Sequence, residues 1–289
     1  MAITDAEVIK IEEKALAIRK TIIEMLAESG SKGLYGHTAG PMGMADIFAA
    51  LYFHILKHDP KNTEWEERDR LFLSNGHITP VRYAAMAHAG YFPLEECMTL
   101  RKFGSRLQGH PERERLPGIE TTSGPLGSGL SQAAGYAYAA RMDASTSLST
   151  GKKKFRVFCA MSDGEQQEGN TWEGVMFAGK YRLTNLTGIM DRNNIQIEGN
   201  TEDIMPLEPL ADKYRAFNWH VIEIDGHNVR QFADACDEAA AIQEKPTLIL
   251  ANTIPGKGVK EIENDYKWHG KPPTKEEAKR FLAELEQSR

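Results

Sequence analysis

Apolar residues recur every three to four positions in six stretches of the chain, which is the spacing of one helix face. These stretches predict helices over residues 5–28, 43–56, 80–89, 128–143, 229–243 and 274–288. Between them lie apolar runs that are too short for ordinary helices and rich in β-branched or aromatic residues. These runs predict buried strands at 71–74, 155–161, 186–191, 220–224 and 247–253.

Alternation of helices and strands predicts an α/β fold. Right-handed crossovers place consecutive strands parallel, so we expect a doubly wound, mostly parallel sheet with helices on both faces. The 289 residues lie at the upper edge of what one domain holds, and no repeat or low-complexity segment divides them. We therefore expect one domain over residues 1–289.

Composition and charge narrow the classes of partner. The net charge of −6 argues against a general nucleic-acid binder, because phosphate neutralisation needs clustered cations and residues 152–154 form the only basic run. No apolar stretch approaches the roughly 18 residues of a membrane span, and the first residues lack a signal peptide's apolar centre. Cys97, Cys159 and Cys236 are few and odd in number, which favours reduced thiols. We expect a cytoplasmic protein without a membrane partner.

Three of the predicted strands end in polar, glycine-rich segments, at residues 74–77, 162–164 and 191–194. In an open parallel sheet the ligand lies outside the carboxyl ends of the strands. Asp163 follows one such strand, and Asn193 follows the next about thirty residues later. Carboxylate, amide and backbone oxygens suit Mg²⁺ or Ca²⁺, which typically bring a diphosphate with them. Either dipeptide alone, Asp163-Gly164 or Asn193-Asn194, would be read as a turn.

Together, this pair resembles the motif shared by thiamine-diphosphate enzymes, GDG followed after about thirty residues by NN. The resemblance implies a metal ion, Mg²⁺ with Ca²⁺ as a possible substitute, held by the Asp163 carboxylate, the Asn193 amide and the backbone carbonyl of Ile195. Gly164 would let the backbone approach the phosphates. Here Ser162 replaces the usual leading glycine.

Four histidines beside glycines narrow the resemblance to the transketolase family, which the chain resembles over residues 30–272. Imidazole can hydrogen-bond a sugar hydroxyl or a phosphate and relay protons near neutral pH. The family match implies that His37, His77, His110 and His269 line the channel to the reactive thiazolium carbon, with His77 and His269 also contacting the cofactor. A structural or surface role is expected for the remaining histidines, namely His54, His58, His88, His220 and, as a loop stabiliser, His227.

Two further segments add to the resemblance. Residues 124–129, GPLGSG, are similar to the family's GPLGQG, which implies that the Gly124 backbone hydrogen-bonds the aminopyrimidine and that Leu126 packs against the cofactor. As a bare glycine-rich loop before a helix, the segment would indicate only generic phosphate binding. Glu168 aligns with a glutamate that joins the two cofactor sites of a dimer in this family. Without the motif around it, Glu168 would be a helix first-turn charge.

The resemblance ends where the family's first domain ends, before the pyrimidine-binding domain that carries the activating glutamate. We therefore expect the N-terminal subunit of a split transketolase, inactive until a partner supplies the C-terminal half, in an assembly of two copies of each. The implied reaction, of the pentose phosphate pathway type, transfers a two-carbon ketol unit from a ketose phosphate to an aldose phosphate. The alternatives are part of a deoxyxylulose-phosphate synthase-like enzyme, a split enzyme dedicated to an unusual sugar, and a non-catalytic regulatory domain that binds the cofactor.

Overall fold

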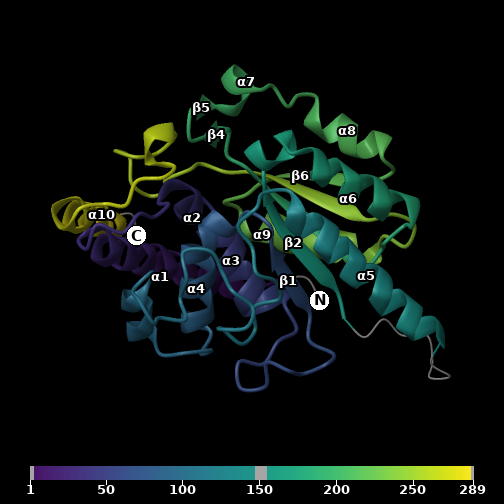
Figure 1. The fold of residues 1–289 in the computed structure, drawn as a ribbon, viewed down its shortest axis with the longest axis horizontal. Helices are drawn as coiled ribbons and strands as arrows, with labels where there is room; N and C mark the ends of the chain where they lie inside the picture. The colour runs from purple at the N-terminus through teal and green to yellow at the C-terminus, as the bar shows by residue number, and fades with distance from the viewer. Residues whose placement is uncertain (1–2, 147–154, 288–289) are drawn as a thin grey trace.

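The structure is a computed structural model that describes residues 3–146 and 155–287 (Figure 1). The basic run at 152–154 lies outside the described residues. Helix α1 (Asp5–Gly30) begins at a capping box, in which Thr4 and Glu7 satisfy each other's backbone N–H groups. The helix predicted over residues 5–28 begins at the same residue as α1 and ends two residues earlier.

Five parallel strands form the central sheet, in the order β1 (Arg70–Leu73), β2 (Val157–Ser162), β3 (Leu186–Arg192), β7 (Thr247–Asn252) and β6 (His220–Asp225). All five correspond to the apolar runs in the sequence. The predicted parallel α/β fold is confirmed. Because the strands are parallel, their carboxyl ends lie along one edge of the sheet.

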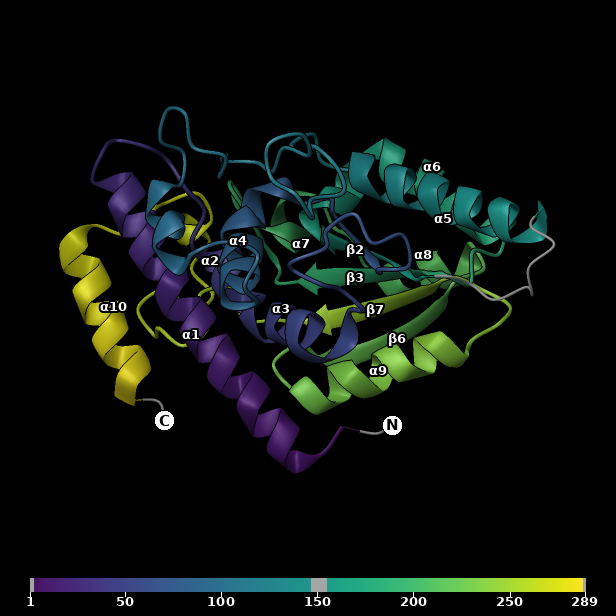
Figure 2. The ribbon, with the colours of Figure 1, turned by 90° about the horizontal axis from the view of Figure 1, so that it is seen from below.

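Helices cover both faces of the sheet (Figure 2). Residues along the strands alternate between two hydrophobic clusters, as the pleat requires: Phe158 and Ala160 of β2 belong to one, and Cys159 and Met161 to the other. The first cluster includes α1, α3 (Ala45–Ala50), α4 (Thr79–His88) and α9 (Val229–Ala241), with α10 (Lys275–Gln287) packed on α1. The second includes α5 (Ser128–Thr146), α6 (Gly169–Lys180) and α8 (Leu210–Ala216).

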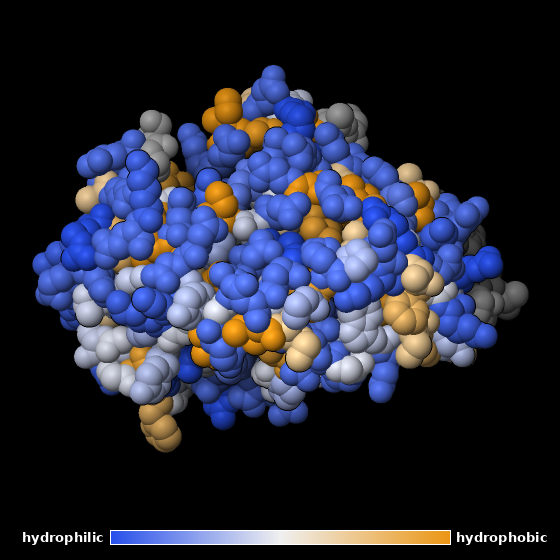
Figure 3. All heavy atoms as spheres, turned by 90° about the horizontal axis from the view of Figure 1, so that it is seen from above, coloured by the Kyte–Doolittle hydropathy of each residue, from blue (hydrophilic) through white to orange (hydrophobic). Residues whose placement is uncertain are grey.

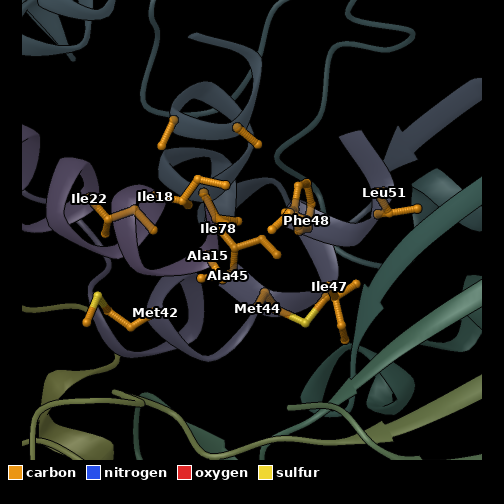
Figure 4. Packing of buried hydrophobic residues seen from close by; sticks show 14 of the residues in the cluster. Ala15, Ile18, Ile22, Met42, Met44, Ala45, Ile47, Phe48, Leu51 and Ile78 are labelled. Carbon is orange, nitrogen blue, oxygen red and sulfur yellow. The ribbon is translucent and has the colours of Figure 1, made fainter. Parts of the chain in front are cut away.

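The centre of the first cluster is the contact of α1 with α3 and α4 (Figure 4). Ile18, Ile22, Phe48 and Ile78 are fully buried there. Truncating such a side chain to alanine costs about 2–5 kcal/mol of folding free energy. This packing holds α1, α3 and α4 together, and the loops at the carboxyl edge of the sheet connect to these helices.

The helix predicted over 43–56 is divided in the structure. It consists of α2 (Ala39–Gly43), α3, and a wider π-type turn over Leu51–Ile55, closed by the Leu56 N–H on the Leu51 carbonyl at 2.8 Å. A side chain at Gly43 would lie 3.0 Å from the Ile254 carbonyl oxygen, so glycine permits the close approach at this break. Apolar spacing continues across all three pieces, which is why periodicity alone shows a single helix.

Short polar elements at the carboxyl edge were not predicted. They are the hairpin of β4 (Ile195–Gln196) with β5 (Gly199–Asn200) and helix α7 (Thr201–Ile204). Two to four residues are too few for a hydrophobic period to register. The space-filling view of the side that carries α7 and α8 shows apolar patches separated by hydrophilic surface (Figure 3).

The three cysteines are free and buried, as the reduced-thiol prediction requires. Among the described residues, no helix is long and apolar enough to span a membrane.

Candidate functional site

The polar ends of β2 and β3 are neighbours in the sheet. Ser162 pairs with Asp191 in the register, and the Asp163 N–H donates to the Asp191 carbonyl at 3.2 Å. The two segments singled out by the sequence therefore meet at one edge, as parallel pairing predicts. The β1 end, residues 74–77, follows the strand on the other side of β2.

Asp163 is fully buried between these strand ends. Its Oδ1 accepts the Gly164 N–H at 2.7 Å, and its Oδ2 accepts the Asn194 N–H at 2.6 Å and the Arg192 guanidinium at 3.1 Å. Burial raises the pKa of the carboxyl above its ordinary value, and Arg192 with the two backbone N–H groups opposes that rise. These contacts join the end of β2 to the end of β3.

Asn193 is oriented by a residue to which the sequence analysis gave no role. Its side-chain amide donates to the Asp191 carboxylate at 2.8 Å, and its side-chain oxygen accepts the Ile195 N–H at 3.0 Å. Asp191 itself is fully buried and receives the Thr253 hydroxyl. Burial raises the pKa of Asp191 to about 7. A carboxylate two residues before a predicted ligand was the available signal, in the motif MDRNN.

The oxygen set fits a hard divalent cation. Within the described chain no group of three or more His, Cys, Asp or Glu side chains could hold a metal ion. The predicted set has one carboxylate only, completed by an amide and a backbone carbonyl, so it leaves positions for oxygens that a diphosphate brings. Asp163, Asn193 and Ile195 lie on consecutive strand ends joined by hydrogen bonds.

Three of the four predicted histidines form one cluster. The ring centroids of His37 and His77 lie 5.0 Å apart, those of His77 and His269 5.1 Å, and those of His37 and His269 5.5 Å. They come from the segment before α2, the end of β1, and the turn before α10. The fold therefore gathers residues from both ends of the chain beside the strand ends.

Burial keeps these histidines neutral. It lowers the pKa of His37 to about 3, that of His77 well below the ordinary 6.5, and that of His269 in the same direction. Neighbouring histidines add to the effect at His37 and His77, because one protonated ring disfavours another. Neutral imidazoles can both donate and accept hydrogen bonds, so the cluster can relay a proton without holding a fixed charge.

His110 approaches the same place from the 109–127 loop. A side chain at Gly76 would lie 3.2 Å from the His110 ring, 2.7 Å from the Ser123 hydroxyl and 3.1 Å from the Gly124 nitrogen. The β1 end next to His77 is thus packed against the loop that holds His110 and Gly124. This contact brings the fourth histidine beside the others.

Several buried polar atoms in this region have no partner in the described chain. They include both side-chain atoms of Asn75, the Ser123 hydroxyl, and the Nδ1 atoms of His37 and His269. Buried polar atoms are normally hydrogen-bonded, so a group of orphans at one place indicates a polar ligand. The edge of the sheet therefore has the donors and acceptors of a binding site.

Residues 13–286 match the family described as "Transketolase, thiamine diphosphate binding domain". The chain belongs to this family. Over 278 residues it is 43% identical to the 6-deoxy-6-sulfo-D-fructose transketolase subunit SqwG of Clostridium sp. (strain MSTE9), covering 96% of this chain and 97% of that protein. It is 36% identical to a subunit of the apulose-4-phosphate transketolase of Phocaeicola vulgatus, covering 92% and 90%.

Solved transketolases share the fold. The transketolase from Leishmania mexicana superposes with a TM-score of 0.88 at 34% identity, covering 96% of this chain and 41% of that one. The chain thus spans less than half the length of the solved transketolases, and nearly the full length of the relatives named as subunits.

The segment that the sequence predicts to contact the cofactor includes Gly124 and Leu126. Leu126 is half-buried, and Gly127 has a φ of 80°, a conformation that glycine adopts without strain. Gly164 makes only ordinary contacts in this transketolase-type domain, since a side chain there would lie 3.6 Å from Gln196. The roles implied for these residues stay predictions.

Glu168 is exposed and lies at the N-cap of α6 without a side-chain capping bond. Its Cβ is close to Gly127, because a side chain at Gly127 would lie 2.9 Å away. A negative charge at this position is favourable for the helix dipole, as the structural alternative for Glu168 supposed. The role at a subunit interface stays a prediction.

Four of the other five histidines of this transketolase-type domain have structural partners, and the fifth, His54, is exposed. His88 contacts the Thr21 hydroxyl at 3.0 Å, and His58 contacts the Tyr52 carbonyl at 2.8 Å. His220 pairs with Glu238. His227 donates to Asp46 at 2.7 Å and accepts the Ile254 N–H at 2.7 Å, which confirms it as a loop stabiliser.

Proposed function

We propose that this chain is the diphosphate-binding subunit of a split transketolase. It binds thiamine diphosphate through Mg²⁺ at Asp163, Asn193 and the Ile195 carbonyl, and transfers a two-carbon ketol unit from a ketose phosphate to an aldose phosphate when a partner subunit is present. The observation that carries the proposal is the meeting of His37, His77 and His269, with ring centroids 5.0–5.5 Å apart, at the carboxyl edge of the sheet.

When bound, thiamine diphosphate supplies the carbanion chemistry that breaks and forms the carbon–carbon bonds of the sugars. The chain's own residues bind and orient. Asp163, held in place by the Gly164 and Asn194 N–H groups, would hold the metal ion and supply one compensating negative charge. The neutral histidines present ring nitrogens to sugar hydroxyls, and the unpartnered Nδ1 atoms of His37 and His269 are available for such bonds.

A partner subunit is part of the proposal. The chain covers 41% of the Leishmania mexicana transketolase. Two relatives of nearly equal length are named as transketolase subunits. Exposed apolar residues include Tyr136 and Met142 on α5, Met176 on α6 and Tyr181 directly after α6, and obligate interfaces are typically rich in such residues. All three features are explained by a heterotetramer with two copies of each chain.

A second candidate is a split transketolase dedicated to an unusual sugar. The relatives of similar length are named for a sulfonated fructose and for apulose 4-phosphate. Both of these sugars carry an anionic group at the far end of the molecule. A panel of phosphorylated and sulfonated ketoses, tested with the reconstituted complex, distinguishes this candidate from a general transketolase.

The experiment that tests the proposed function is reconstitution. The chain is co-purified with the partner subunit, loaded with thiamine diphosphate and Mg²⁺, and assayed for ketol transfer by a coupled reaction. Transfer that depends on both chains and on the cofactor supports the proposal. A complex that binds thiamine diphosphate and transfers no ketol unit from any ketose in the panel contradicts it.

A further inference from the structure

Glu165 is a buried carboxylate that the proposed mechanism does not use. It is 1% exposed and lies in the turn between β2 and α6. Three donors converge on it: the Gly127 N–H at 2.5 Å and the Ser74 hydroxyl on Oε1, and the Ser162 N–H at 3.1 Å on Oε2. A carboxylate that accepts several backbone N–H groups forms the strong, charge-assisted kind of hydrogen bond.

The three donors belong to three different segments of the site. Ser74 is the first residue after β1, Ser162 is the last residue of β2, and Gly127 ends the loop before α5. Ser74 extends the network, because its hydroxyl oxygen accepts the Gly129 N–H of α5 at 3.0 Å. One side chain therefore joins two strand ends to the start of a helix.

These are also the segments that hold the expected cofactor contacts. His77 follows Ser74 by three residues, and Gly124 and Leu126 precede Gly127. In the same two segments, Gly76 packs against Ser123 and Gly124 with no room for a side chain. The distance between the β1 end and the 124–127 loop is thus set by two contacts, the packing of Gly76 and the hydrogen bonds of Glu165.

Altering Glu165 would remove a hydrogen-bond partner from the 124–127 loop. Gly127 is held against the start of α6, where a side chain would lie 2.0 Å from the Asn170 amide oxygen. Its N–H has the Glu165 carboxylate as its partner. Without that acceptor a buried N–H is left without a hydrogen bond, which is unfavourable, so we expect the loop to shift until water can reach this group.

We propose that Glu165 is a positioning residue for the cofactor, which fixes the spacing of the β1 end and the 124–127 loop so that both contact thiamine diphosphate together. The inference rests on the proposed function, since the site it serves is the thiamine-diphosphate site. Glu165 does not touch the cofactor in this scheme. It acts through Ser74 and Gly127.

The test is Glu165→Gln, compared with Asp69→Asn. Asp69 is a matched control, because its carboxylate also accepts two backbone N–H groups, from Lys57 and Arg156, both at 2.8 Å, but at the opposite end of β1. Calorimetry measures thiamine diphosphate binding with saturating Mg²⁺ to the complex with the partner subunit. Steady-state assays give the cofactor KM and the kcat at saturating cofactor.

We expect Glu165→Gln to raise the dissociation constant and the cofactor KM about tenfold, the equivalent of one buried hydrogen bond to a charged group. The kcat at saturating cofactor should stay within about twofold of wild type, because bound cofactor restores the loop spacing. Asp69→Asn should lower the melting temperature and leave the cofactor KM unchanged. Equal cofactor affinity in Glu165→Gln and wild type would overturn the inference, as would an equal loss in both variants.

Ser74→Ala provides a second measurement if Glu165→Gln does not fold. It removes one donor to Glu165 and the acceptor of the Gly129 N–H, so a weaker affinity for thiamine diphosphate is expected, and wild-type affinity in a folded Ser74→Ala refutes the positioning role. Failure of the proposed function is distinguishable from both outcomes. In that case the wild-type complex itself transfers no ketol unit, whereas the positioning role is decided by the difference in thiamine diphosphate affinity between the wild type and the variants.

Discussion

The rings of His77 and His269 lie 5.1 Å apart at an interplanar angle of 35°, although His77 follows β1 and His269 lies in the turn before α10. We predict that His77→Ala and His269→Ala each lower kcat by about 10²-fold or more, the usual contribution of a proton-relaying side chain. Both rings belong to short turns and not to a strand or an α-helix, so kcat should fall far more than thermal stability.

A coupled assay and thermal melting of the reconstituted complex measure the two quantities. His220→Ala is the control, since His220 pairs with Glu238 away from the site. Full ketol transfer by either site variant would return that histidine to a structural role.

Asp163→Ala should abolish Mg²⁺-dependent binding of thiamine diphosphate. The buried carboxylate is the only charged member of the predicted oxygen set, and without it a bound metal ion has no compensating protein charge there. Calorimetry with and without Mg²⁺ measures the effect. Asp225→Ala, at the end of β6, is a strand-end control that should bind as wild type does. If Asp163→Ala and wild type bind thiamine diphosphate with equal Mg²⁺-dependent affinity, Asp163 is not a ligand of the metal ion.

The low pKa of His37 has a consequence for stability. The folded chain binds this proton only near pH 3, whereas the unfolded chain binds it near the ordinary 6.5. Between these values the unfolded state holds more protons, so the contribution of His37 makes folding stability fall as pH is lowered from 6.5. His37→Gln should therefore lose less stability than wild type between pH 7 and pH 5.

Denaturant unfolding at the two pH values measures this difference. Asp191 acts in the opposite sense, because its pKa is raised to about 7, so the comparison of variant with wild type is what isolates His37. His54→Gln replaces an exposed histidine and serves as the control. An identical pH dependence in His37→Gln and wild type would contradict the assignment of a buried neutral ring.

Gly76→Ala should weaken cofactor binding more than it weakens folding. The added methyl group would lie 2.7 Å from the Ser123 hydroxyl and 3.1 Å from the Gly124 nitrogen, so the 123–124 segment must move. Overpacking of this kind costs about 1–3 kcal/mol. Gly135→Ala is the control, because its methyl group meets no atom within 4 Å on α5. Titration of thiamine diphosphate into both variants measures the difference in affinity. Equal affinities would show that cofactor binding does not need the close approach of Gly76 to the 123–124 segment.

The isolated chain should lack ketol-transfer activity and gain it on mixing with the partner subunit. The exposed side chains of Tyr136 on α5, Met176 on α6 and Tyr181 after α6 should also make the isolated chain self-associate, since apolar surface of this kind is usually covered. Analytical ultracentrifugation and a coupled assay at matched concentrations test both statements. Robust activity from this polypeptide alone, at the rate of the mixture, would refute the split-enzyme proposal.

Much of the fold was predictable because it is encoded by local periodicity. The runs that became β2, β3 and β7 are short and mostly apolar, as is typical of parallel strands buried on both faces. The break after Gly43 was not predictable, because it depends on the approach of Ile254 from the far end of the chain. The β4–β5 hairpin and α7 were missed because two to four polar residues carry no period.

For the site, the sequence by itself determined which residue types stand at the strand ends: Asp163 after β2, Asn193 after β3 and a histidine three residues after Ser74. Only the tertiary structure decided which of them meet. The histidine cluster depends on chain segments that are distant in sequence. The role of Asp191 depends on its burial and on the hydrogen bond that it accepts from the Asn193 amide.

In the sequence, Glu165 is one of several polar residues in a turn, and nothing there distinguishes it. Its convergence with Ser74, Ser162 and Gly127 arises only when the sheet brings three loops to one edge, because a hydrogen-bond network is a property of positions in space.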